Sequence, residues 1–183
     1  MAGDRDSLWT ELVSRAQRGD RDACAGLYAA FARTVHAIVL GYVGAGAADD
    51  VTQEVFGSVF ASLPRLRDPA AFPAFVCTAA RNAARDALRQ KRRTPRSEPV
   101  DELVAREPSP AASAEQREAA AQVLAVIATL PETYRETLLL RLVAGLSGPE
   151  IAERTGMTHG SVRVNLTRGM ALLRPLLQEA GLP

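Results

Sequence analysis

The chain has 183 residues, of which 47% are hydrophobic and 23% are charged, so it is long enough for one domain or two small ones and too apolar to be disordered. The net charge of +1 hides a separation, because residues 1–96 carry 14 basic and 10 acidic side chains whereas residues 97–115 carry one and five. Cys24 and Cys77 match no metal or redox spacing. No segment has the eighteen apolar residues of a membrane span, and the N-terminus lacks a signal-peptide pattern, so we expect a cytoplasmic protein.

Hydrophobic residues recur with a helical period along most of the chain, and the β-branched runs typical of strands are missing. We therefore expect an all-α fold. A first helix is predicted over residues 7–18, where Gly19 closes it. Asp20 is placed to cap a longer second helix, whose apolar stripe continues until the glycine pair at Gly44 and Gly46.

A third helix is predicted to begin at Asp50, because Asp50 and Gln53 have the spacing of a capping box. This helix should continue to Pro64, and residues 64–73 are expected to form a loop. The fourth helix, over about 74–92, is expected to turn Phe75 and its alanines inward and its arginines outward.

Residues 94–114 contain four prolines and several acidic side chains and follow neither the helix nor the strand period, which predicts a flexible linker. The chain is therefore divided into a helical domain over 1–93, a Pro-rich acidic linker over 94–114, and a second helical domain over 115–183. In the second domain a helix is expected over 115–128, and the segment 129–132 should cap the next helix. The apolar side of that helix is predicted to comprise Leu138, Leu139, Leu142 and Val143.

The segment 146–166 has the spacing of two short helices joined by a glycine turn. Ser147 and Glu150 form a capping box, so a helix is expected to begin near Gly148. Gly156 can adopt a positive φ, and Thr158 can cap a second helix that begins near His159. The pattern predicts a DNA-binding helix-turn-helix, although an ordinary antiparallel helix pair without nucleic acid would share it.

The second helix of this pair has an apolar face formed by Val162, Leu166 and Leu173. Side chains on its other faces could enter a major groove, where an arginine can contact guanine or phosphate. These side chains are Ser161, Arg163, Val164, Thr167 and Arg168.

The predicted fourth helix carries a basic ridge, because Arg81, Arg85 and Arg89 recur every four residues and residues 81–96 hold seven basic side chains against one acidic. Such a ridge can follow a phosphate backbone, although a solvated helix face would have the same pattern. Aromatic rings beside a cationic groove are what unstacked bases need. Phe75 lies on the apolar stripe and is expected in the core, whereas Phe72 is expected to be exposed.

Three segments, in this order, resemble motifs of the extracytoplasmic-function group of sigma factors, the dissociable promoter-recognition subunits of bacterial RNA polymerase. Residues 50–56 resemble the polymerase-binding motif, residues 75–82 with the basic run resemble the promoter-opening helix, and residues 130–173 resemble the C-terminal domain. The resemblance covers nearly the whole chain. It implies that the protein directs promoter recognition and transcription initiation, and that it is not an enzyme and needs no cofactor or metal.

The resemblance also implies a role for each group of residues. The polymerase-binding positions are Asp50, Gln53, Glu54 and Phe56. The positions that capture bases of the minus-ten element are Asp68, Phe72, Phe75, Arg81, Asn82, Arg85 and Arg89. The positions that read the minus-thirty-five element are Thr158, His159, Ser161, Arg163, Val164, Thr167 and Arg168.

The partners that the resemblance implies are core RNA polymerase, promoter DNA and an anti-sigma factor that holds the protein inactive, with no membrane contact of its own. Three positions depart from the family: Phe75 stands where tryptophan is common, Asn165 where arginine is frequent, and Gly169 where alanine is usual. Two alternatives remain open. A conventional helix-turn-helix regulator would dimerise and footprint DNA without polymerase, and a nucleic-acid enzyme would need a phosphate loop, metal cluster or nucleophile that the sequence does not show.

Overall fold

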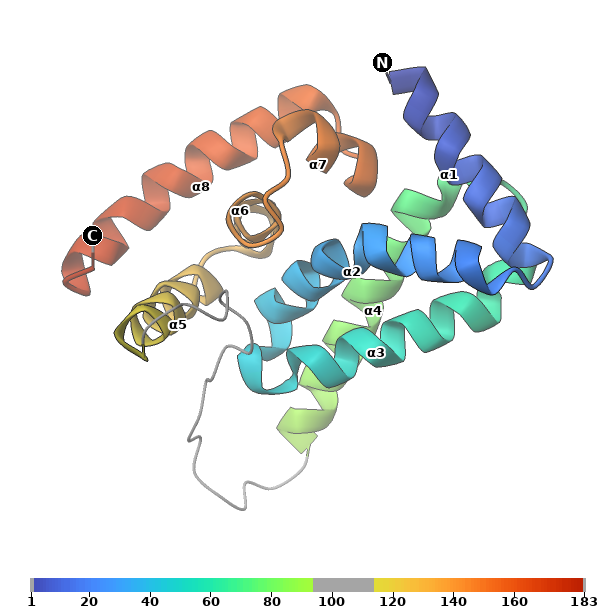
Figure 1. The fold of residues 1–183 in the computed structure, drawn as a ribbon. Coiled ribbons are helices and arrows are strands. Elements are labelled where there is room, and N and C mark those ends of the chain that lie inside the picture. The colour runs from blue at the N-terminus through green and yellow to red at the C-terminus, as the bar shows by residue number, and fades with distance from the viewer. Residues whose placement is uncertain (1, 94–113, 183) are drawn as a thin grey trace.

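The computed structural model describes residues 2–93 and 114–182, with side chains placed for residues 9–91 and 118–182. Within these ranges the regular elements are helices and no strand occurs, so the all-α prediction is confirmed (Figure 1). The predicted linker, apart from its last residue, lies outside the described residues. An N-terminal group comprises α1 (Ala2–Gln17), α2 (Arg21–Val43), α3 (Ala45–Ser62), the 3-10 turns η1 (Leu63–Arg65) and η2 (Pro69–Ala71), and α4 (Phe72–Arg93). A C-terminal group comprises α5 (Ala114–Ala128), α6 (Glu132–Leu142), α7 (Gly148–Thr155) and α8 (His159–Glu179).

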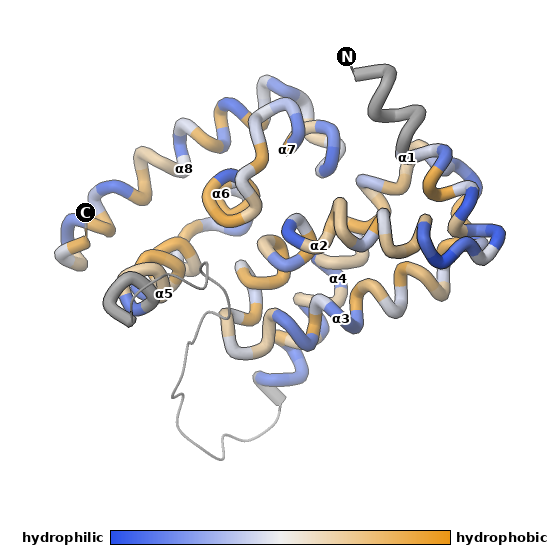
Figure 2. The backbone as a smooth tube through the Cα atoms, in the orientation of Figure 1, coloured by the Kyte–Doolittle hydropathy of each residue, from blue (hydrophilic) through white to orange (hydrophobic). Residues whose placement is uncertain are grey.

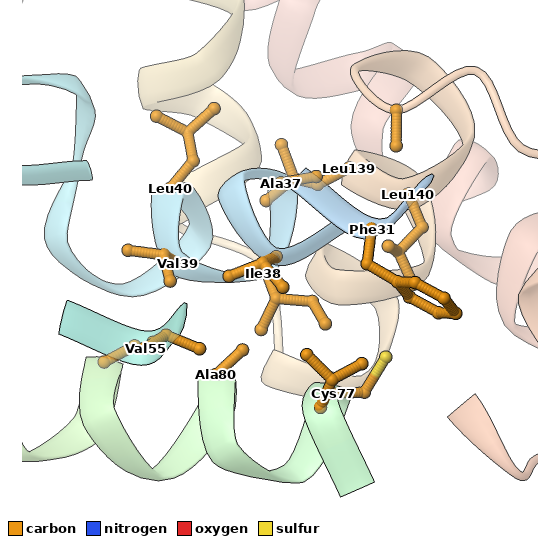
Figure 3. Packing of buried hydrophobic residues seen from close by; sticks show 14 of the residues in the cluster. Phe31, Ala37, Ile38, Val39, Leu40, Val55, Cys77, Ala80, Leu139 and Leu140 are labelled. Carbon is orange, nitrogen blue, oxygen red and sulfur yellow. The ribbon is translucent and has the colours of Figure 1, made fainter. Parts of the chain in front are cut away.

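Helix α2 is the centre of the molecule, since it contacts α1, α3 and α4 of its own group and also α5 and α6 of the other group. Its residues are apolar along most of its length (Figure 2). Ile38 and Val39 face α3 and α4, while Phe31 and Ala37 lie near Leu139 and Leu140 of α6 (Figure 3). The two groups therefore share one hydrophobic core.

By length and composition, α2 is the one helix in the described part of the chain that could cross a membrane. The search of the sequence for eighteen consecutive apolar residues did not detect this helix. Half of its apolar window is buried inside the protein. A core helix passes the same test, and the packing of α2 against five neighbouring helices accounts for its composition.

Two predicted helix starts are wrong by five residues. Helix α1 begins at Ala2 and not at residue 7, and α3 begins at Ala45 and not at Asp50. Gly44 adopts a φ of +76° and makes the turn from α2 to α3 by itself, so the alanines that follow it are already helical. Asp50 consequently lies inside α3, and the capping box proposed for Asp50 and Gln53 does not exist. By contrast, Asp20 caps α2 as predicted, accepting hydrogen bonds from the backbone N–H groups of Asp22 and Ala23.

The start of α6 also differs from the prediction. Pro131 holds the N-cap position without a side-chain hydrogen bond, and the Thr129 hydroxyl donates instead to the Val126 carbonyl of the preceding helix at 2.7 Å. Leu142 is 52% exposed, and the buried leucines of α6 are Leu138, Leu139 and Leu140. Helix α6 has two packing faces, against α2 and against α8, so its buried residues are consecutive and do not follow a single stripe.

Candidate nucleic-acid interface

Helices α7 and α8 are joined and capped as the sequence predicts. The Ser147 backbone N–H donates to Glu150 Oε2 at 2.9 Å, and the Glu150 backbone N–H donates to Ser147 Oγ at 3.4 Å, which completes the capping box. Gly156 ends α7 in the left-handed region at φ +74°, where a side chain would be strained. Thr158 Oγ1 accepts from the Ser161 N–H at 3.1 Å and caps α8. These contacts fix the turn of a helix-turn-helix.

The buried side of α8 packs in the core of the C-terminal group. Val162 and Leu173 are buried, as are Ile151 and Ala152 of α7. Gly169 lies where α8 crosses α6, and a Cβ atom built there would lie 3.1 Å from Leu138 Cδ1. The glycine at this departure from the family avoids a contact with Leu138 and Tyr134 that would be tight for an alanine.

The seven residues predicted to contact the minus-thirty-five element share one property: their side chains are exposed. Arg163, Val164, Thr167 and Arg168 line a shallow hollow on α8. Within the described ranges, neither Arg163 nor Arg168 has a hydrogen bond or ion pair to another side chain. An accessible arginine pair on the second helix of a helix-turn-helix matches what major-groove recognition requires.

The basic ridge of α4 has a different environment, because two of its arginines are paired with acids of α6. Arg81 donates from Nε and Nη2 to both carboxylate oxygens of Glu136 at 2.9–3.1 Å, and the two side chains are 20% and 8% exposed. Hydrogen bonding to Glu136 holds the pKa of Arg81 above its ordinary value. Arg85 forms a hydrogen-bonded ion pair with Glu132, which raises the pKa of Arg85.

Tyr42 of α2 completes this polar cluster, and sequence reasoning did not identify it. Its hydroxyl donates to Glu132 Oε1 at 2.6 Å, and this hydrogen bond is the main reason why the pKa of Glu132 is lowered. Burial, reinforced by the hydrogen bond to Glu132, raises the pKa of Tyr42 to about 12. The Arg85 guanidinium also lies 5.8 Å from the centre of the Tyr42 ring.

Of the two phenylalanines, Phe72 is the buried one, so the prediction of an exposed Phe72 ring is wrong. Phe72 is 0% exposed and packs edge-on against Phe31 at 5.3 Å between ring centroids. The reason is that α4 begins at Phe72, two residues earlier than predicted, so Phe72 lies one turn before Val76 on the buried face of the helix. The other fully buried residues of this face are Cys77, Ala80 and Ala84. Phe75 is partly exposed at the edge of the core.

The remaining minus-ten candidates lie at the surface. Asp68 accepts from the Ala70 N–H at 3.0 Å and caps the turn before α4. Asn82 is exposed, and Arg89 pairs with Asp86 one helical turn away. The side chains of Arg92 and Arg93 and the whole of Arg96, which the sequence adds to the ridge, lie outside the described residues.

The candidate polymerase-binding motif lies on α3. Asp50, Gln53 and Glu54 are exposed on this helix, whereas Phe56 is 3% exposed and packs at a tilt against Tyr28, with 4.6 Å between ring centroids. Phe56 therefore supports the exposed residues from within the core and does not lie at the surface itself.

Other candidate chemistry is weak in the described part of the chain. Both cysteines are free, and burial raises the pKa of the Cys77 thiol to about 12. In the ranges searched, no group of three histidine, cysteine, aspartate or glutamate side chains could hold a metal ion. His36 lies 3.4 Å from Asp49 across the α2–α3 turn.

Comparison with known proteins is consistent with this arrangement. Residues 27–94 match the family described as Sigma-70 region 2, and residues 120–173 match the family described as Sigma-70, region 4. The first match contains the α3 and α4 candidates, and the second contains the helix-turn-helix.

Full-length relatives extend these matches over nearly the whole chain. The ECF RNA polymerase sigma factor ShbA of Streptomyces griseus is 34% identical over 98% of this chain and 100% of its own length. Two solved structures share the fold. CnrH, solved in complex with the cytosolic domain of CnrY, matches with a TM-score of 0.66 and 24% identity, over 93% of this chain and 97% of CnrH. The sigma factor RpoE from Bartonella quintana, solved in complex with the anti-sigma factor NepR, matches with a TM-score of 0.58 and 17% identity, over 84% of this chain and 96% of RpoE. The chain belongs to the family of ECF RNA polymerase sigma factors, which are transcription-initiation factors.

Proposed function

We propose that the protein divides promoter recognition between its two helical groups. Residues 1–93 bind core RNA polymerase and the minus-ten element, residues 94–114 link the two domains, and residues 115–183 bind the minus-thirty-five element. The observation that carries this proposal is the exposed arginine pair on α8, in a capped helix-turn-helix within a chain of the sigma family. As a subunit of the polymerase it would act in the cytoplasm, without an enzymatic activity of its own.

The minus-ten surface consists of the exposed and half-exposed members of the predicted set. Asp68, Phe75, Asn82, Arg85 and Arg89 flank the accessible side of α4, and Arg81 joins them when Glu136 is displaced. Phe72 supports this surface from the core and does not contact bases. An extruded base loses a few kcal/mol of stacking, which an aromatic edge and phosphate contacts would offset.

The polymerase-binding surface is the exposed side of α3 that carries Asp50, Gln53 and Glu54. Phe56 keeps this helix in position by packing on Tyr28. An anti-sigma factor would inhibit the protein by covering this surface, since two partners that need the same residues exclude each other. The fold shared with RpoE, which was solved with the anti-sigma factor NepR, supports this mode of regulation.

The upstream assignment is tested by run-off transcription with core polymerase on a library of promoter fragments. Arg163→Ala should change the preference at one or two positions of the minus-thirty-five element by roughly 1–3 kcal/mol, because each base-contacting arginine discriminates by about that amount. Arg174→Ala, an exposed arginine later in the same helix, is the matched control. An unchanged promoter profile for Arg163→Ala would remove this residue from the recognition surface.

The downstream assignment is tested by the salt dependence of open-complex formation. Arg85→Ala combined with Arg89→Ala should weaken open complexes and reduce the salt slope by about one for each lost phosphate contact. Arg21→Ala combined with Arg33→Ala removes two exposed arginines of α2 and serves as the control. Equal slopes for the two double variants would contradict the assignment of α4 to DNA.

A further inference from the structure

The exposed side of α8 carries an apolar side chain between its arginines. Val164 lies in the second turn of this helix and is 42% exposed, whereas Val162 and Leu173 on the opposite side are buried in the core. Val164 therefore contributes little to packing within the chain. It is available to a ligand on the recognition side of the helix-turn-helix.

The surroundings of Val164 form the shallow hollow that it lines together with Arg163, Thr167 and Arg168. Val164 and Thr167 are three residues apart, so they are neighbours on the helix surface. Arg163 and Arg168 are five residues apart and lie on either side of this pair. Valine and threonine are short and each presents a methyl group, whereas the arginine side chains are long and cationic. The hollow is thus apolar at its centre and positively charged at both ends.

The edges of base pairs in the major groove offer few apolar groups to such a hollow. Guanine, adenine and cytosine present hydrogen-bond donors and acceptors there, and thymine adds a methyl group at C5. A donor or acceptor pressed against Val164 would lose its water without gaining a partner, which is unfavourable. A methyl group gains from leaving water. The hollow therefore favours a pyrimidine with a C5 methyl group, and the flanking arginines suit the phosphates or guanines beside it.

We propose that Val164, together with the methyl group of Thr167, binds the C5 methyl group of one thymine in the minus-thirty-five element, so that Val164 determines the base at this position without a hydrogen bond. The inference deepens the proposed role of α8 at that element and rests on it. 5-Methylcytosine presents the same methyl group in the major groove and shares this chemistry. Thymine is the expected ligand because it carries the group in all DNA, whereas cytosine acquires it only by modification.

The test uses holoenzyme assembled from core RNA polymerase and the full-length chain, on the promoter that it transcribes most strongly from the fragment library. Each thymine of the minus-thirty-five element, on either strand, is replaced in turn by deoxyuridine, which removes the methyl group and leaves the hydrogen-bonding groups in place. In a parallel series each cytosine is replaced by 5-methylcytosine. Promoter affinity is measured as the concentration of holoenzyme that gives half-maximal run-off transcription.

Three variants identify the side chain that contacts the methyl group. Val164→Ala shortens the apolar side chain, and Val164→Ile retains it. Leu172→Ala is the matched control, because Leu172 is 43% exposed on the same helix, two turns later and outside the hollow. Since both positions are exposed, the three variants should keep the wild-type midpoint in urea.

We expect deoxyuridine at one thymine to weaken binding of the wild-type holoenzyme about fourfold, because the burial of one methyl group is worth about 0.8 kcal/mol. Val164→Ile and Leu172→Ala should show the same loss. Val164→Ala should bind the thymine promoter more weakly than the wild type does, and it should bind the thymine and deoxyuridine promoters alike. The two changes remove the same contact, so together they should cost no more than either alone.

Some results would overturn the inference and leave the proposed function intact. The wild type would transcribe, but its preferred element would contain no thymine on either strand, or deoxyuridine would have no effect at any position. A loss that persists in Val164→Ala would assign the methyl contact to another residue. Dependence on 5-methylcytosine and on no thymine would assign the hollow to methylated DNA.

Two further outcomes separate the inference from its alternatives. Equal weakening by Val164→Ala and Leu172→Ala on every template, with or without the methyl group, would show that the apolar residues of α8 contact a protein and not a base. If the wild-type holoenzyme transcribes from no fragment of the library, the proposed function fails, and the inference fails with it.

Discussion

Two helices of this protein carry arginines suited to binding nucleic acid, but the surroundings of these arginines differ. On α8 the candidate residues are exposed and Arg163 and Arg168 have no side-chain partner among the described residues. On α4, Arg81 and Arg85 are bound to carboxylates of the other helical group. The same residue type is therefore available at one site and occupied at the other.

The difference shows that chemistry and availability are separate properties. The spacing of arginines along a helix determines which ligand the helix can bind. Whether that ligand can bind depends on what else the chain places against the helix, and here α6 supplies acids to α4 and none to the exposed side of α8. The predictions below test each side of this contrast.

The largest effect is expected where a predicted DNA contact proved to be core. Phe72→Ala should lower the free energy of unfolding by about 3–5 kcal/mol, because the fully buried ring leaves a cavity beside Phe31. Phe75→Ala, at the edge of the core, should lower it by much less and should instead weaken open complexes. Urea denaturation followed by circular dichroism measures the first effect, and equal destabilisation by the two substitutions would reverse the assignment.

A smaller loss is expected where α8 crosses α6. Gly169→Val should destabilise the C-terminal group by roughly 1–3 kcal/mol, since its branched side chain would overlap Leu138 and the Cβ of Tyr134. Gly57→Ala is the matched control in an exposed part of α3, where a Cβ meets no atom within 4 Å, and it should stabilise the protein by about 0.5–1 kcal/mol. A Gly169→Val protein with the wild-type midpoint in urea would show that the crossing can relax.

The capping box of α7 should contribute less again. Ser147→Ala removes the side-chain acceptor for the Glu150 N–H and should cost about 1 kcal/mol. Thr129→Ala, whose hydroxyl bonds only the end of the preceding helix, should cost clearly less. Thermal unfolding of the two variants side by side distinguishes them, and the prediction fails if Thr129→Ala is the more damaging change.

The smallest effect concerns the pH dependence of the hydrogen bond between Tyr42 and Glu132. The pKa of Glu132 is lowered in the folded protein, so its contribution is complete above its ordinary pKa and is lost as the pH falls through the lowered value. The pKa of Tyr42 is raised to about 12, so its contribution is complete below the ordinary pKa of tyrosine and is lost as the pH rises through about 12. The hydrogen bond between Tyr42 and Glu132 should thus persist across the neutral pH range. Absorbance titration of tyrosinate should lose its component near pH 12 in Tyr42→Phe, and retention of that component would assign it to another tyrosine.

Local sequence signals predicted the helix-turn-helix well. The capping box at Ser147, the left-handed Gly156 and the Thr158 cap each depend on residues three or fewer positions apart, so the sequence contains the whole determinant. The exposed side of α8 followed from the same helical period. The all-α fold was predicted for the same reason, whereas the family was predicted from the resemblance of three ordered motifs to those of known sigma factors.

Contacts between distant segments could not be predicted in this way. Arg81 and Glu136 are 55 residues apart, and nothing in the pattern of α4 or α6 identifies the partner. The exposure of Phe72 was mispredicted because this residue was placed in the loop before the helix, whereas it is the first residue of α4 and lies one turn before the buried Val76. The start of α3 was mispredicted because Gly44 alone makes the turn from α2. Helix α3 therefore begins at Ala45, and Asp50 lies inside it and cannot be its N-cap.

The chain contains one tryptophan, Trp9, and the fold places it at the seam between the two helical groups. Its indole N–H donates to Glu153 of α7 at 3.2 Å, and its ring packs edge-on against Phe31. The fluorescence of an indole in this position depends on the nearby carboxylate and on the polarity of its surroundings. The native protein therefore contains an intrinsic optical probe. Its emission should move to longer wavelength if α7 separates from Trp9, so the contact between the two helical groups can be followed in real time without attaching any dye.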